Sequence, residues 1–278
     1  MKSRPSVRPE SEDEQPRLAV LIDADNAQPA VIEGLLAEVA KYGVASVKRI
    51  YGDFTSTRMT QWKQALLKHS INPVQQFAYT SGKNATDSSL IIDAMDLMYT
   101  GRFDGVCLVS SDSDFTRLAQ RLREEGLTVY GFGERKTPDA FVQACDKFIY
   151  VEVLRSEASA PAAPPSPPKP AKKEAARPAA KKPAGQAEPT AAPAAESGRH
   201  ESLPLKLIRQ AIEEASDDQG WAFLGGVGSY LSKVRPDFDT RLYGHKKLSD
   251  LMKAHPRHFT VEERAGEGGA KRFYVRAA

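Results

Sequence analysis

The residues best suited to chemistry are aspartates placed directly after short apolar runs. Asp23 ends the run LAVLID, with Asn26 three residues later, and Asp112 and Asp114 follow another run in LVSSDSDF. Asp87 begins a helical pattern in KNATDSSLIIDAMD. Carboxylates that share one cleft repel each other unless a cation neutralises them, and oxygen ligands suit Mg²⁺ or Mn²⁺. These aspartates therefore predict a shared metal site, where a bound ion can activate water for phosphodiester hydrolysis.

Helix capping is the alternative interpretation of each aspartate. Aspartate and serine accept hydrogen bonds from the first amides of a helix, and SDSDF is itself a good capping sequence. Asp87 could likewise cap the helix that it begins. Asp23 is less suited to capping because no helix starts on it at once. The conjunction of three such motifs favours the metal site.

The elements that must position these aspartates alternate between strand-like and helical patterns. The strand-like runs are 18–23, 45–52, 72–79, 105–110, 128–133 and 148–153, and the helical patterns are 29–42, 58–69, 87–99, 114–125 and 138–144. This alternation predicts an α/β fold with a parallel sheet and helices on both faces. If the first and fourth strands are neighbours, Asp23, Asp112 and Asp114 meet at one edge of the sheet, where such sheets bind ligands.

Composition divides the 278-residue chain into two folded parts. Residues 158–198 contain ten prolines and no Val, Ile, Leu, Met, Phe, Trp or Tyr, so they cannot bury a core and predict a disordered linker. We therefore expect a disordered tail over 1–16, a first domain over 17–157, a linker over 158–202 and a second domain over 203–278. With two cysteines in apolar runs, no apolar run of about 18 residues and no signal-peptide core, we expect a cytoplasmic protein without a membrane partner.

The segment after the linker has the pattern of a winged helix. Helical patterns at 204–215, 227–234 and 246–254 precede two strand-like stretches, 258–263 and 272–276. Its candidate phosphate-binding residues are Lys233, Arg235, Arg241, His245, Lys246 and Lys247. A solvated basic face is the alternative, because Asp237, Asp239 and Asp250 are interleaved with them.

The motifs of the first part resemble those of the NYN domain. The segments LIDADN, KNATDSSLIIDAMD and VCLVSSDSDFTRLAQRLREEGLTVYGFG occur in family order, and the resemblance covers residues 17–153. It implies a PIN-like nuclease fold and an Mg²⁺- or Mn²⁺-dependent ribonuclease. By motif position it assigns the catalytic and metal-binding roles to Asp23, Asp87, Asp112 and Asp114, with Asn26 as polar support. Asp25 departs from the pattern, since the family often has glycine there.

Other residues receive supporting roles. Asp93 is similar to a recurrent family acid, but it lies about 240° around a helix from Asp87, so we expect it either to support the metal ligands from behind or to support helix packing. Ser111 could contact a phosphate at the helix start. Lys83, in a glycine-containing loop, and Arg58, near Trp62, could contact RNA. A solvated loop is the alternative for Lys83, and for Trp62 the alternative is a place on the core face of its helix.

The last part resembles the OST-HTH/LOTUS domain. The resemblance rests on GWAFLGGVGSYL, PDFDTRLYGHKKLSDLM and the final hairpin, over about 203–276. It implies binding of RNA or of a protein partner.

The sequence thus predicts a ribonuclease whose second domain delivers RNA, with oligomeric state and substrate preference left open. A non-catalytic RNA-binding regulator is the alternative. An aspartate-based phosphotransferase suggested by Asp23-Ala24-Asp25 is disfavoured, because position 27 is alanine and no catalytic lysine fits.

Overall fold

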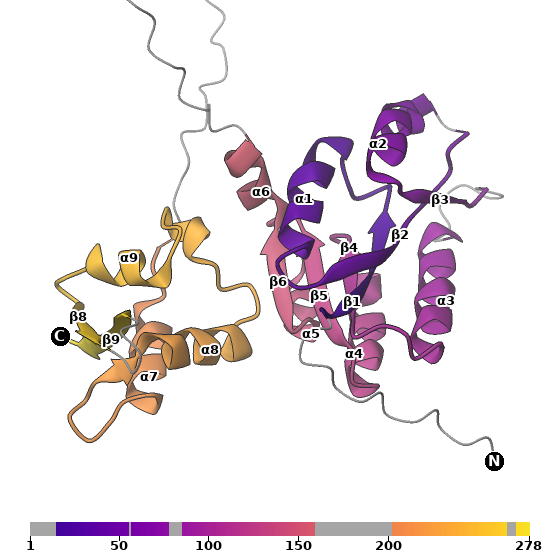
Figure 1. Cartoon of the computed structure of the whole chain (residues 1–278). Coiled ribbons are helices and arrows are strands. Elements are labelled where there is room, and N and C mark those ends of the chain that lie inside the picture. Colours follow the sequence, from indigo (N-terminus) through magenta and orange to yellow (C-terminus); the bar gives the residue numbers. More distant parts are fainter. Residues whose placement is uncertain (1–14, 56, 78–84, 159–201, 266–270) are drawn as a thin grey trace, which may run out of the picture.

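The computed structural model describes residues 15–55, 57–77, 85–158, 202–265 and 271–278 (Figure 1). Residues 1–14 of the predicted tail and 159–201 of the predicted linker lie outside this range. In the part of the chain that the structure describes, no helix is long and apolar enough to span a membrane.

The first unit is built on a parallel sheet, as predicted. Its strands are β1 (Arg17–Asp23), β2 (Val44–Gly52), β3 (Asn72–Gln75), β4 (Gly105–Val109), β5 (Thr128–Gly133) and β6 (Lys147–Tyr150). They are arranged in the order β3-β2-β1-β4-β5-β6, and every neighbouring pair is parallel. The first and fourth strands are therefore neighbours, and the strand order reverses between them. A ligand crevice is expected at this point, beyond the carboxyl ends of the strands.

Helices cover both faces of this sheet. One core joins Ala19 and Leu21 of β1 to α3 (Ala85–Tyr99), α4 (Thr116–Glu124) and α5 (Asp139–Ala144). The other joins Leu18, Val20 and Ile22 of the same strand to η1 (Pro29–Val31), α1 (Ile32–Val39) and α2 (Trp62–His69), which follows η2 (Thr57–Gln61). Because successive side chains of a strand point to opposite faces, a wholly apolar strand buries both faces.

The expected strand over 148–153 is wrong in its second half. The strand ends at Tyr150, and the chain continues as α6 (Val151–Ala158). Val151 and Leu154 are buried in the core beneath α1, where Leu154 lies against Gly34. A Cβ at Gly34 would lie 3.2 Å from the Leu154 Cβ. Tertiary packing of this helix against α1 thus overrides the strand preference of its valines.

The second unit is a small α/β domain. It contains α7 (Leu205–Glu214), β7 (Ala222–Phe223), α8 (Leu224–Val234), η4 (Thr240–Tyr243), α9 (Leu248–Lys253), β8 (Phe259–Ala265) and β9 (Lys271–Ala277). The strands form an antiparallel sheet in the order β7-β9-β8. The predicted helices and final hairpin are confirmed. The two-residue β7 and the short η4 are additions, since neither is long enough to show a periodic pattern.

The two units contact each other along the free edge of β6 (Figure 1). The Phe148 amide donates a hydrogen bond of 3.0 Å to the Pro236 carbonyl, and the Tyr150 hydroxyl donates one of 3.0 Å to Asp237. Arg241 of η4 donates to both carboxylate oxygens of Glu38 on α1, at 2.9 and 3.0 Å. The second unit thus covers a strand edge that would otherwise expose unpaired backbone groups.

Candidate metal centre

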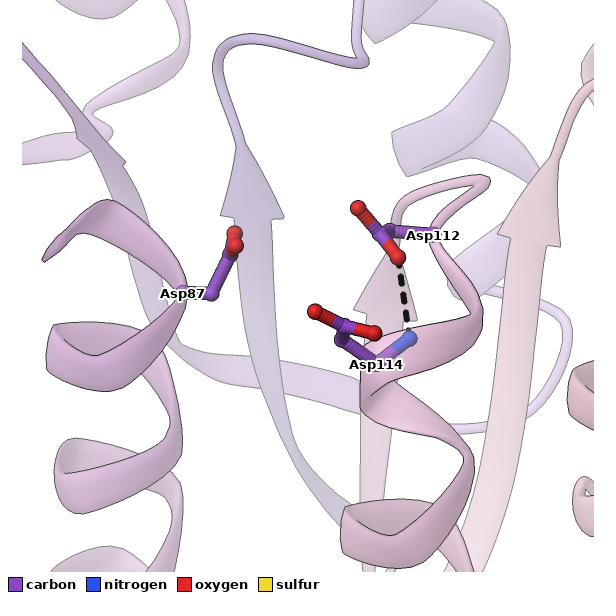
Figure 2. Close-up of side chains that lie close together, drawn as sticks. All are labelled: Asp87, Asp112 and Asp114. Atoms are coloured by element: carbon purple, nitrogen blue, oxygen red, sulfur yellow. Dashed lines mark hydrogen bonds between the residues drawn. The ribbon is translucent and has the colours of Figure 1, made fainter. Parts of the chain in front are cut away.

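Three aspartates meet at the point where the strand order reverses. Asp87 lies in the first turn of α3, Asp112 follows β4, and Asp114 lies in η3 (Ser113–Phe115). Each offers a carboxylate oxygen, and these atoms all lie within 4.8 Å of one another. Figure 2 shows Asp87 on one helix facing Asp112 and Asp114 at the start of the helix opposite. The edge predicted from the strand pattern therefore gathers carboxylates from separate parts of the chain.

Asp112 is both a cap and a member of this triple. Its Oδ1 accepts a hydrogen bond of 2.9 Å from the Asp114 amide, so it is the N-cap of η3 (Figure 2). The two interpretations left open by the sequence are therefore compatible. The cap fixes the Asp112 carboxylate beside Asp114.

Asp23 lies beside the triple but is bound differently. It is fully buried at the end of β1, where its carboxylate accepts hydrogen bonds from Asn26 Nδ2 at 2.7 Å, Ser110 Oγ at 2.8 Å and the Asp25 amide at 3.0 Å. Burial raises the pKa of Asp23 despite these hydrogen bonds. Asn26 thus donates to the carboxylate beside which the motif places it, and Ser110 adds a donor from the end of β4.

Two carboxylates of the cluster, Asp87 and Asp112, form no ion pair with a basic side chain among the described residues. Burial, followed by the negative charges of Asp23, Asp112 and Asp114, raises the pKa of Asp87 to about 6. An arrangement of this kind is unfavourable by itself and favours a bound cation.

Comparison with protein families assigns both units. The NYN domain model matches residues 17–153, and the OST-HTH/LOTUS domain model matches residues 202–269. The chain carries an NYN domain followed by an OST-HTH/LOTUS domain. NYN domains belong to the PIN-like ribonuclease families, so the acidic cluster lies in a domain whose family implies RNA chemistry. The family resemblance stated from the motifs is confirmed, with the same boundaries for the NYN domain.

Three solved structures are similar to parts of the chain. An uncharacterized protein of Nitrosomonas europaea is 47% identical, with 34% of this chain and 91% of that chain covered and a TM-score of 0.28. A protein of unknown function from Vibrio parahaemolyticus is 20% identical, with 50% and 94% covered and a TM-score of 0.42. A protein from Chromobacterium violaceum is 35% identical, with 28% and 84% covered and a TM-score of 0.24. No curated protein matches the chain.

The NYN cluster fits a hard divalent cation. Its donors are carboxylate oxygens, the ligands that Mg²⁺ and Mn²⁺ prefer, and they come from rigid helix starts. Asp114 is exposed, and Asp87 and Asp112 are half-buried, so an ion could keep several waters. Burial and, after it, repulsion from neighbouring carboxylates raise the pKa of Asp87, and a bound cation would offset this repulsion. The residues present therefore fit the metal that the family implies.

The supporting residues lie in different environments. Asp93 accepts hydrogen bonds from Arg49 and the buried Tyr51, so its carboxylate is held by residues of β2. Ser111 Oγ accepts a hydrogen bond of 2.8 Å from the Glu134 amide, so it joins the end of β4 to the loop after β5. Lys83 and the side chain of Arg58 lie outside the described residues, so their RNA contacts stay predictions.

The basic residues predicted for the OST-HTH domain divide into two groups. Lys233, Lys246 and Lys247 are exposed, while His245 is half-buried with its ring centre 6.3 Å from that of His255. Arg241, in contrast, pairs with Glu38 of the NYN domain and with Asp239. Sequence reasoning missed this contact because its partners are 203 positions apart and Glu38 shows no motif.

Proposed function

We propose that this chain is a metal-dependent ribonuclease: its NYN domain hydrolyses phosphodiester bonds of RNA and its OST-HTH domain binds RNA. The observation that carries the proposal is the acidic triple Asp87, Asp112 and Asp114 at the reversal of strand order. The family match supplies the substrate class.

In this proposal, Asp87, Asp112 and Asp114 hold Mg²⁺ or Mn²⁺. When bound, such an ion supplies an activated water and stabilises the charge that develops on the scissile phosphate. Asp87 binds the ion in its deprotonated form, which a pKa of about 6 makes the main form at neutral pH.

Asp23 lies beside these ligands as a buried carboxylate. Its hydrogen bonds to Asn26 and Ser110 fix its position, and its negative charge acts on Asp87. Because the carboxylate is fully buried, it cannot move away when the ion or the substrate arrives. We assign it catalytic importance through this charge, as a ligand or as the direct neighbour of one.

RNA contacts are proposed at exposed cations of the OST-HTH domain. Lys233, Lys246 and Lys247 are exposed on the OST-HTH domain and are suited to phosphate contacts.

The free thiols of Cys107 and Cys145 are buried, which supports a cytoplasmic setting. A protein partner on the OST-HTH domain is compatible with the same family match.

The direct test is incubation of the full chain with labelled single-stranded RNA in Mg²⁺, in Mn²⁺ and in EDTA. We expect cleavage that needs the metal and falls at least about 100-fold in Asp112→Asn, since metal-site partners typically contribute 10–100-fold or more. Asp96→Asn removes the same charge from an exposed position on α3 and should cleave normally. RNA binding without cleavage in every metal would contradict the nuclease and favour a non-catalytic regulator.

A further inference from the structure

The outer face of the OST-HTH sheet carries a connected row of aromatic rings and guanidinium groups. The Phe223 and Tyr274 ring centres are 5.8 Å apart, and the Arg264 guanidinium lies 4.5 Å from the Tyr274 ring. The same guanidinium lies 4.9 Å from the Trp221 ring, and the Arg276 guanidinium lies 5.0 Å from that ring. These distances are within the range of cation–π contacts. We call these five residues the wing ladder.

Strand register explains why the ladder lies on one face. Phe223 of β7 is paired with Tyr274 of β9, and Arg276 lies two residues further along β9. Residues two apart share a face of the sheet, so these side chains lie on the side opposite Val275, which is buried in the core. The alternating sequence RFYVR thus places apolar residues inward and the ladder residues outward.

The face that holds the ladder is basic. Arg264, Arg272 and Arg276 lie on it with a single acid of the two long strands, Glu262, which pairs with Arg264 at 3.0 Å. Arg272 and Arg276 are both exposed. The face therefore carries positive charge beside its rings, and this is the combination that complements a polyanion with unpaired bases.

One end of the ladder is open. Phe223 is 46% exposed, whereas Trp221, which contacts the guanidinium groups of Arg264 and Arg276, is 9% exposed. An exposed phenylalanine beside a tyrosine and arginines offers a ring on which a further planar group can stack. A stack that served the sheet alone would not require this exposed ring.

The ladder also lies on the free side of the domain. Contact with the NYN domain uses the segment between α8 and η4, whereas β8 and β9 lie on the side away from the NYN sheet (Figure 1). Docking of the two domains therefore occupies Arg241 and leaves the wing ladder accessible.

We propose that the wing ladder is a binding site for single-stranded RNA. Bases stack on Phe223 and Tyr274, and the exposed arginines contact the adjacent phosphates. The proposal rests on RNA being the substrate of the chain, and it places the main OST-HTH contact on the wing rather than on Lys233, Lys246 and Lys247.

The experiment measures binding of the full chain to a fluorescent single-stranded RNA by anisotropy, in EDTA so that no metal-dependent cleavage occurs. We expect Phe223→Ala to weaken binding about five- to a hundredfold, the range for loss of one base-stacking ring. Val234→Ala is the matched control, because Val234 is also 46% exposed on the same domain and should change binding less than twofold.

A second pair of variants separates stacking from charge. Arg276→Gln removes a ladder cation, and Arg257→Gln removes an exposed cation of the same domain outside the ladder. We expect the first to weaken binding several-fold more than the second, and a duplex of the same sequence to bind less tightly than the single strand. Thermal melting of each variant checks that the domain stays folded.

Wild-type affinity in both folded ladder variants, Phe223→Ala and Arg276→Gln, would overturn the proposal and leave the face to a protein partner. Equal losses in the ladder variants and their controls would also overturn it, since that result reports net charge or hydrophobicity alone. Failure of the wing-ladder proposal is distinguishable from failure of the ribonuclease proposal, which is tested by the metal-dependent cleavage lost in Asp112→Asn. RNA binding through the wing ladder without any cleavage would contradict only the ribonuclease proposal.

Discussion

Two groups of carboxylates in this chain have opposite surroundings. At the end of the NYN sheet, Asp87 faces Asp112 and Asp114, and its pKa is raised to about 6. At the domain contact, Glu38 is 3% exposed, and burial alone would raise its pKa as well. Hydrogen bonds from Arg241 and Lys41 outweigh this burial and hold the pKa of Glu38 at about 2.

The difference lies in whether the protein itself supplies the cation. Glu38 receives a bidentate guanidinium from the other domain, so its charge is neutralised by the fold. For Asp87 and Asp112 the described residues supply no such partner, and neutralisation is left to a ligand. One cluster therefore joins two domains, and the other stores repulsion that a metal ion can relieve.

The largest contrast is expected in cleavage. Asp87→Asn removes a proposed ligand and should lower the rate of metal-dependent RNA cleavage about 100-fold. Glu38→Gln likewise replaces a carboxylate by an amide. The rate at which this variant cleaves a short oligonucleotide should stay within about twofold of the wild-type rate, because the Glu38–Arg241 contact is remote from the three aspartates. Single-turnover assays of both variants measure this. Similar losses in the two would show that the clusters are functionally coupled.

A second effect is expected in the arrangement of the domains. Arg241→Ala leaves Glu38 without its bidentate partner, and breaking a buried pair costs about 3–5 kcal/mol. Separation of the domains lets Glu38 become hydrated, so we expect undocking and a larger radius of gyration in small-angle X-ray scattering. Arg257→Ala, which removes an exposed arginine, is the control. An unchanged scattering profile in Arg241→Ala would show that the β6 hydrogen bonds suffice for docking.

The same contact predicts a direction of pH dependence. The pKa of Glu38 is lower in the docked state than its ordinary value of 4.5, so the contribution of Glu38 to docking is complete above pH 4.5. It is lost as the pH falls from 4.5 toward 2. Scattering profiles recorded between pH 7 and pH 4 should therefore stay constant, with undocking only below this range. Undocking between pH 7 and pH 5 would contradict the assignment.

The smallest effect is expected in stability of the metal-free protein. The folded state raises the pKa of Asp87 from 3.8 to about 6, so stability falls as the pH rises through this range and the full penalty applies above pH 6. Asp87→Asn should raise the melting temperature in EDTA at pH 7.5 by roughly 3 °C, about 1 kcal/mol in a domain of this size. Mg²⁺ should stabilise the wild type but not this variant. A lower melting temperature of Asp87→Asn in EDTA would show that the carboxylate serves the fold.

Much of the NYN domain could be predicted from local pattern. Apolar runs ending in Asp23 and before Asp112 specify strands that are buried on both faces, and the helical segments between them require parallel pairing. The motif order then identified the aspartates that meet. The end of β6 could not be predicted this way, because the valines of α6 prefer strands until packing against α1 decides otherwise.

The sequence by itself determined which residues carry the chemistry and which runs become strands and helices, because side-chain type and hydrophobic period act locally. Only the tertiary structure decided the partners. It placed Asp93 against Arg49 and Tyr51, and it paired Arg241 with Glu38. It also aligned the rings and guanidiniums of the wing into a ladder. Such contacts join residues far apart in the chain, so their energies depend on distances and burial that no local pattern records.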